Sequence, residues 1–291
     1  MRFIIGILSL LSLAGDVQAR SASETGEIAF VREPERRGIW IVSSDGIERQ
    51  LTAEIDYGPD WSPDGSRIAF QRFDGEGSDI YVMRADGSNV RRLTDAGGFF
   101  GPDWSPDGRR ILMGGLGRSD DGREEIFVMD ADGSNLTRLT RSRWTNTRAS
   151  WSPDGAAIVF ASRREGNFDL YVMDSYGGNE RRLTTSPATD MAPVWSPDGS
   201  RIAFISNRRA GGQDVYLIRP DGSGLRRLTN NKALDWAAAW SPDGARLAFT
   251  RSRYKLDRQL IVVIDIRSRT RTRIAISAQY ELHPDWRPVE R

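Results

Sequence analysis

Side chains able to bind a partner or an ion recur just before six tryptophans of this chain, at residues 61, 104, 151, 195, 240 and 286. Four of the six residues that stand five positions before a tryptophan are acids, and several aromatic side chains stand nearby. The candidate binding residues are Asp56, Tyr57, Phe99, Phe100, Asn146, Arg148, Asp190, Met191, Asp235, Trp236, Glu281 and His283. Acids mixed with exposed aromatic residues are typical of protein-binding surfaces, although aromatic residues also fill packing seams.

The four acids of this set come from different copies of a repeat, so only a closed ring could bring them together. They are Asp56, Asp190, Asp235 and Glu281. Like charges gathered in this way must stay hydrated and apart, take up protons through raised pKa values, or hold a cation. We predict no resident cofactor and no metal site, with calcium at the acidic rim as the one ion to test. Attraction of a basic segment of a partner is the other expected use of this charge.

Catalytic chemistry is hard to assemble from these residue types. The chain has one histidine, His283, and no cysteine, which excludes Cys-His catalysis and multi-histidine zinc sites. No G-x-S-x-G motif occurs. The segment Asp130 to Asn135 resembles the start of a calcium loop, but Arg141 stands where the loop needs a glutamate, so we expect a hairpin corner instead. The sequence therefore predicts a protein that is not an enzyme.

The pentapeptide WSPDG dominates the chain and explains how these residues would be positioned. It occurs at 61–65, 104–108, 151–155, 195–199 and 240–244, and a worn copy at 285–288 closes the chain. The steps between the tryptophans are 43 to 47 residues, the period of a propeller blade. Pro, Asp and Gly in this order favour a tight turn, so each copy predicts a hairpin corner. The tryptophan before it is expected to fill the seam between neighbouring blades.

Three further columns of similar segments predict four strands per blade. Continuous apolar runs such as RIAF at 67–70 and IYVM at 80–83 indicate strands buried on both faces. A shorter outer strand follows, mostly as RRLT, whose arginine pairs suit a solvated face. The N-terminal part supplies three strands without a tryptophan strand, and the C-terminal part supplies a tryptophan strand alone. We therefore predict an all-β, six-bladed propeller in which the two ends of the chain share one blade.

Outside the propeller, the N-terminal residues read as an export signal. Arg2, an apolar run over 3–13 and the small-residue pattern at 17–19 predict a signal peptide at residues 1–19, followed by a short lead-in at 20–26 and the propeller at 27–291. The apolar run is too short to span a bilayer. With 41 basic and 40 acidic side chains, the chain lacks the basic excess expected of a nucleic-acid-binding protein.

The succession WSPDG, RIAF, IYVM, DGS and RRLT resembles the repeat of the TolB-like propeller family, over residues 27–291. The resemblance implies a periplasmic module that binds proteins at the mouth of its tunnel. It is confined to the propeller, because nothing between Ala19 and Glu27 has room for the α/β domain that precedes it in TolB. We expect a monomer that binds an exported or outer-membrane-associated protein, such as a peptidoglycan-associated lipoprotein, in a Tol-Pal-like setting. The alternatives are a lyase-type propeller acting on carbohydrates and the propeller module of a peptidase-like system.

Overall fold

The computed structural model describes residues 26–33, 37–43, 46–75, 77–116, 122–209, 212–230, 233–253, 258–274 and 280–288. Twenty-four strands form six blades. From the innermost to the outermost in each blade, the strands of blades 1 to 3 are β24 (Tyr280–Trp286), β1 (Ile28–Glu33), β2 (Gly38–Val42), β3 (Glu48–Gln50); β4 (Asp56–Trp61), β5 (Arg67–Phe73), β6 (Ser78–Arg84), β7 (Arg91–Arg92); and β8 (Phe99–Trp104), β9 (Arg110–Gly115), β10 (Glu125–Asp130), β11 (Thr137–Arg138). Those of blades 4 to 6 are β12 (Asn146–Trp151), β13 (Ala157–Ser162), β14 (Asp169–Asp174), β15 (Arg181–Arg182); β16 (Asp190–Trp195), β17 (Ile202–Ser206), β18 (Asp214–Ile218), β19 (Arg226–Arg227); and β20 (Leu234–Trp240), β21 (Arg246–Arg253), β22 (Arg258–Asp265), β23 (Arg271–Arg273).

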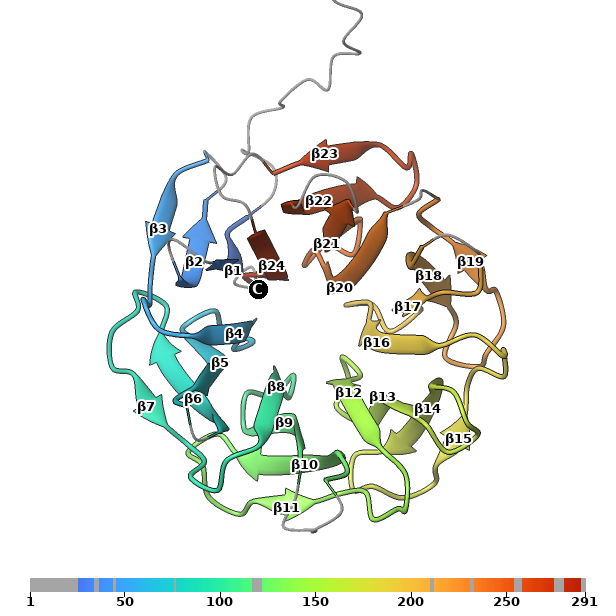
Figure 1. The fold of residues 1–291 in the computed structure, drawn as a ribbon, viewed down its shortest axis with the longest axis horizontal. Helices are drawn as coiled ribbons and strands as arrows, with labels where there is room; N and C mark the ends of the chain where they lie inside the picture. Colours follow the sequence, from blue (N-terminus) through green and yellow to red (C-terminus); the bar gives the residue numbers. More distant parts are fainter. Residues whose placement is uncertain are drawn as a thin grey trace, which may run out of the picture.

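The six blades stand around a central axis, and the two ends of the described chain meet in blade 1 (Figure 1). The C-terminal strand β24 pairs antiparallel with β1, from Ile28 opposite Trp286 to Glu33 opposite Tyr280. In every blade the tryptophan-bearing strand is innermost and the arginine-rich strand is outermost. This confirms the predicted six-bladed fold, four strands to a blade, with the first blade shared by both ends of the chain. The predicted signal peptide lies outside the described residues and stays a prediction.

Each inner strand contains a β-bulge at the same place. In β4, the register shifts between Tyr57 and Asp60, so that two residues face one on β5, and the other five inner strands shift at the equivalent point. The residue three positions before each tryptophan has a left-handed φ of +50° to +58°. Glycine adopts this conformation without strain, whereas other residues incur a cost of about 1–2 kcal/mol. The bulge thus favours the glycine found there in blades 2 and 3, whereas the other four blades hold alanine, arginine or histidine in the same strained conformation.

The WSPDG segments form the hairpin corners that the sequence predicts. In the first copy, the Gly65 N–H donates to the Ser62 carbonyl at 2.8 Å, and Asp64 accepts bonds from the Ser62 hydroxyl and the Ser66 N–H at 2.6 and 3.0 Å. The glycine has a φ of +64° to +69° in all five full copies, as the turn requires. These corners follow the C-terminal ends of the inner strands, whereas the residues that precede the bulges lie at the N-terminal ends.

The tryptophans pack between neighbouring blades, which confirms the seam prediction. Trp61 of blade 2 lies in one cluster with Ile39 and Ile41 of blade 1, and Trp151 of blade 4 packs with Ile126 and Val128 of blade 3. An arginine of the preceding blade covers four of the six indoles, at 4.6 to 5.7 Å from the guanidinium carbon to the ring centroid. The hydrophobic core therefore consists of the seams of the ring and not of one central cluster.

The outer arginine pairs of blades 2 and 4 are exposed, as the sequence indicates, and such pairs also make structural contacts. In blade 4, Arg182 forms a 2.7 Å ion pair with the buried Asp169, whose partner Thr184 accepts the Leu170 N–H at 3.0 Å. The first arginine, Arg181, donates to the Pro220 carbonyl of blade 5 at 2.5 Å. Arg49, Arg91 and Arg226 make the same kind of contact with the next blade. One arginine thus orders its own blade, and the other ties it to its neighbour.

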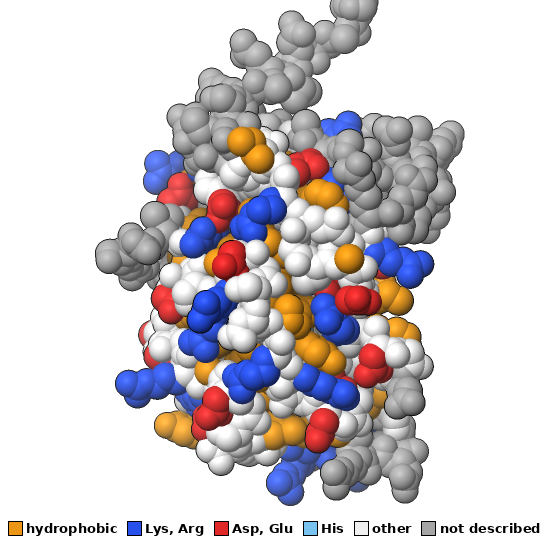
Figure 2. Space-filling view, turned by 90° about the vertical axis from the view of Figure 1, so that its left-hand side faces the viewer, with side chains coloured by type: hydrophobic (Ala, Val, Ile, Leu, Met, Phe, Trp, Pro, Cys, Tyr) orange, Lys and Arg blue, Asp and Glu red, His pale blue; other side chains and the backbone are white. Residues whose placement is uncertain are grey.

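The outer surface shows no large region of a single charge on the side that carries β3 and β7, where basic and acidic side chains are interspersed (Figure 2). This distribution agrees with the near-balance of 41 basic and 40 acidic residues. Across the described ranges, no helix has the length and apolar character needed to cross a membrane.

Closure through β24 yields a stability prediction. Trp286 is only 3% exposed and fills the seam of blade 1, so Trp286→Ala should lower the free energy of unfolding by about 3–5 kcal/mol. Tyr176 is 84% exposed, and Tyr176→Ala should change it by less than about 0.5 kcal/mol. Deleting residues 278–291 should abolish the cooperative transition. Urea unfolding of the three proteins measures this, and an unchanged midpoint in the deletion would show that the ring does not depend on β24.

Candidate binding site at the central tunnel

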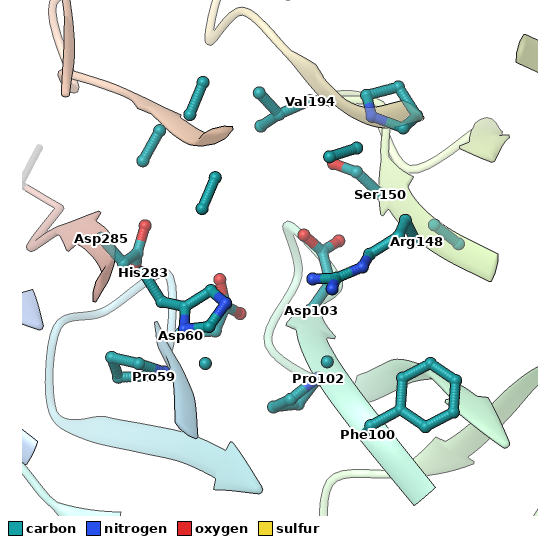
Figure 3. A pocket seen from close by; sticks show the side chains of 18 of the residues that line it. Pro59, Asp60, Phe100, Pro102, Asp103, Arg148, Ser150, Val194, His283 and Asp285 are labelled. Carbon is teal, nitrogen blue, oxygen red and sulfur yellow. The ribbon is translucent and has the colours of Figure 1, made fainter. Parts of the chain in front are cut away.

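The inner strands surround a tunnel with a cavity of about 170 Å³. Residues two to four positions before the tryptophans line it, together with those directly before them (Figure 3). One side of the wall is acidic, because blades 1, 2 and 3 contribute Asp285, Asp60 and Asp103. The equivalent residues of blades 4, 5 and 6 are Ser150, Val194 and Ala239. The tunnel is therefore chemically asymmetric although its backbone repeats.

Each of the three tunnel carboxylates bonds to the next blade. The backbone N–H of Trp61 donates to Asp285 at 2.9 Å, that of Trp104 to Asp60 at 2.7 Å, and that of Trp151 to Asp103 at 2.8 Å. The bond from Trp61 to Asp285 joins residues 224 positions apart and so reinforces the ring closure. These three carboxylates were not among the predicted site residues. The tripeptide Pro-Asp-Trp, present in just these three blades, was the available sequence signal.

The tunnel raises the pKa of all three carboxyls. Burial raises the pKa of Asp103 and of Asp285 to about 7, with the Asp285 charge adding to the effect on Asp103. The pKa of Asp60 also lies well above its ordinary value, through burial and the negative charges of Asp285 and Asp103. The hydrogen bonds from the tryptophan N–H groups act in the opposite direction but are outweighed. Asp103 and Asp285 therefore titrate near neutral pH.

Arg148 is the cation of the tunnel. It stands at the bulge of β12 with a φ of +54°, and its guanidinium extends into the lumen (Figure 3). Within the described residues it forms no hydrogen bond or ion pair. Arg148 is exposed to the lumen, but the surrounding tunnel wall keeps it away from bulk solvent. This desolvation lowers the pKa of Arg148. The strained backbone of β12 thus places a guanidinium group in the lumen.

His283 occupies the equivalent bulge of β24, with a φ of +50°. Its ring meets Trp236 edge-on at 5.2 Å and Tyr57 edge-on at 6.3 Å between ring centroids. Its Nδ1 atom is buried and has no hydrogen-bond partner among the described residues. Burial, followed by the charge of Arg148, lowers the pKa of His283 to about 3. The imidazole is therefore neutral at physiological pH.

The predicted acidic rim is wrong for three of its four residues. Asp56, Asp190 and Asp235 are at most 1% exposed and lie inside the blades. Each forms an ion pair with an arginine in or just after the adjacent strand: Arg72 at 2.7 Å, Arg208 at 2.6 Å and Arg251 at 2.7 Å. The physical reason is the bulge, which places the residue five positions before the tryptophan and the residue directly before it on opposite faces of the strand. Glu281 pairs in register with Arg32 along the β24–β1 ladder.

The remaining candidates divide between the tunnel and the blade interior. Phe100 lines the tunnel, while Phe99 is buried and meets Phe127 edge-on at 5.4 Å between ring centroids. Asn146 is buried and donates to Glu125 at 2.9 Å. Tyr57, Met191 and Trp236 are half-buried. The structure thus brings Phe100, Arg148 and His283 together in the lumen, with Tyr57 and Trp236 beside the histidine.

The structure offers no cluster for the calcium considered at the rim. Over the described ranges, no three His, Cys, Asp or Glu side chains are placed to hold a metal ion. In the segment that resembles a calcium loop, Asp130 and Asp132 instead accept bonds from Asn135 and Ser134 within a hairpin corner.

Stability should depend on pH through the tunnel carboxyls. Since the folded state binds these protons more tightly than the unfolded chain, their contribution is full near pH 4 and is lost as the pH rises through about 7. His283, with a lowered pKa, contributes in the opposite direction below about 6.5. We expect Asp103→Asn with Asp285→Asn to remove part of the fall in Tm between about pH 5 and pH 8, while the amide oxygen still accepts the tryptophan N–H. Asp86→Asn, at the surface, should leave the slope unchanged; an equal slope in all three would contradict the raised pKa values.

The single histidine permits a direct measurement. The ¹³C and ¹⁵N shifts of His283 should report a neutral ring from about pH 8 down to pH 5, because its pKa is about 3. Arg148→Ala should raise the pKa, but only in part, because burial is the larger cause. A midpoint near 6.5 in the wild-type protein would show that the imidazole is solvated.

Comparison with known proteins agrees with this geometry. The family model described as the TolB beta propeller domain matches residues 18–209, and the Tricorn protease N-terminal beta propeller domain matches 169–288. The Tol-Pal system protein TolB of Anaeromyxobacter dehalogenans is 55% identical over 38 residues, which are 13% of this chain and 9% of that protein.

Two solved structures show the range of similar folds. TolB from Acinetobacter baumannii superposes with a TM-score of 0.81 at 26% identity, over 91% of this chain and 67% of that one. An oligogalacturonate lyase solved in complex with manganese matches with a TM-score of 0.56 at 17% identity, over 86% and 73% of the two chains. The second likeness shows the fold alone. The match to the propeller model covers more than half of the sequence, and the chain therefore belongs to the TolB beta propeller domain family.

Proposed function

We propose that this protein is an exported, non-catalytic binding module of the bacterial cell envelope that receives a segment of a partner protein at the mouth of its tunnel. The observation that carries the proposal is the pair Arg148 and His283. Both hold left-handed backbone conformations that other blades fill with glycine or alanine, and both present polar atoms without partners among the described residues. Strain retained at a cavity in this way points to binding.

The chemistry of the mouth suits a protein segment. Phe100, Trp236 and Tyr57 supply aromatic surface beside the two polar residues, and aromatic anchors with an arginine are typical of interaction hot spots. An acidic side chain or a terminal carboxylate of the partner would satisfy Arg148. The lumen of about 170 Å³ admits a narrow segment and not a folded domain.

The family supports a setting in the periplasm. The relatives bear the name of TolB, and the one from Anaeromyxobacter dehalogenans is named as part of the Tol-Pal system. Together with the signal-peptide pattern at residues 1–19, this supports export to the periplasm and a peptidoglycan-associated lipoprotein as the partner to test first. A lyase-type role would instead require Arg148 and His283 for turnover of an acidic oligosaccharide.

Calorimetry with the purified mature protein and the lipoprotein of the same organism tests the proposal. Arg148→Ala and His283→Ala should each weaken binding about tenfold or more, because each removes a contact at the centre of the site. Both replace a residue by the type found in blades 5 and 6, so the Tm should be equal to that of the wild type or higher. Arg109→Gln, at the opposite end of the inner strands, is the matched control. Unchanged affinity in both tunnel variants would rule out the tunnel as the binding site.

A further inference from the structure

We propose a second binding site, for a phosphate-bearing ligand, in the crevice between blades 5 and 6 at the end of the propeller opposite to the tunnel mouth. The crevice has a volume of about 530 Å³, within the ~300–1,000 Å³ of small-molecule pockets. Arg201 and Arg226 of blade 5 and Arg267 of blade 6 line it, and Trp240 lies among them.

The crevice arises from a departure from the repeat. At the equivalent position of three other blades, an arginine lies over the tryptophan of the next blade: Arg67 over Trp104 at 5.0 Å, Arg110 over Trp151 at 4.6 Å and Arg246 over Trp286 at 5.7 Å. Arg201 is the corresponding residue of blade 5. Among the described residues it makes no such contact with Trp240, and both side chains line the open crevice. The group that closes the seam elsewhere is therefore available here for a ligand.

The arginines of the crevice lack anionic partners. Within the described part of the chain, the guanidinium groups of Arg201 and Arg267 form no hydrogen bond or ion pair, and Arg226 donates only to the Ile266 carbonyl at 3.3 Å. Burial and the positive charges of Arg201 and Arg269 lower the pKa of Arg226, and no carboxylate offsets them. An anion between these groups would relieve their mutual repulsion.

The carboxylates of the crevice are engaged within their own turns, which leaves the arginines as the groups open to an anionic ligand. Asp198, Asp243 and Asp265 accept hydrogen bonds from serine hydroxyls and N–H groups of these turns, at 2.5 to 3.0 Å. A phosphate monoester carries a charge of about −1.5 to −2 and three acceptor oxygens, and it can meet several guanidinium groups at once.

Titration of the mature protein with inorganic phosphate and with glucose 1-phosphate tests the site. Calorimetry should detect binding, and the Nε1–H signal of Trp240 should shift in the NMR spectrum. Arg201→Gln and Arg267→Gln should each weaken binding about tenfold, because each removes a charge-assisted contact. Among the described residues neither guanidinium group forms a hydrogen bond or an ion pair, so the Tm should be unchanged. Arg109→Gln, a surface arginine at the same end of the propeller, should bind as the wild type does.

Vesicles identify the source of the phosphate. Retention on phosphatidic acid vesicles, but not on phosphatidylcholine vesicles, with loss in the Arg201→Gln, Arg267→Gln double variant, would assign the site to a lipid headgroup. Binding of the soluble phosphates without retention would assign it to a soluble ester. The proposal is overturned if neither phosphate nor vesicles bind and Trp240 does not shift, or if the double variant binds as tightly as the wild type.

Discussion

The fold depends on the packing of one tryptophan per blade into the seam with the neighbouring blade. A four-stranded sheet of this size cannot bury both of its apolar faces alone, so each blade needs two neighbours, and only a closed ring supplies them all. The indole packs into the apolar cluster of each seam, and arginines lie over four of the six indoles and shield them from water. Closure by β24 makes this arrangement circular, because Trp286 is itself one of the six.

The same inner strands that form the seams also form the tunnel, and the bulge decides which side chains enter it. The bulge requires a left-handed residue, which glycine adopts without strain in two blades and alanine adopts in two others. Arg148 and His283 are the two large side chains at this position. The three carboxylates that tie blades 1 to 4 together line one side of the lumen, while blades 5 and 6 contribute apolar residues such as Val194 and Ala239. A repeated backbone thereby presents a directional site.

The fold could be predicted from the sequence because every blade repeats the same local chemistry. WSPDG specifies a turn, the apolar runs specify buried strands, and the count of columns specifies the shared blade. The site could be predicted only in part. The acids at 56, 190 and 235 recur five positions before a tryptophan, a spacing that fits an exposed ring and a set of buried ion pairs equally well. Their arginine partners stand about 16 to 18 residues further along the chain, so the pairing is not visible in the local sequence. In blade 3 the acid is replaced by Phe99 and its arginine partner by Gly115, which pairs with Phe99 on the adjacent strand. This joint replacement was a sign that the position faces a partner within the blade.

The central claim, that a partner segment enters the tunnel from the side of the bulges, can be tested directly because the chain has no cysteine. A single cysteine replacing Ala237, which lines the tunnel, and another replacing the exposed Ala156 at the opposite end give two unique labelling sites. The rate of thiol labelling is measured with and without saturating peptidoglycan-associated lipoprotein. The bound partner should slow the labelling of Ala237→Cys by about an order of magnitude and leave the labelling rate of Ala156→Cys unchanged. Equal labelling of Ala237→Cys with and without bound partner would contradict it.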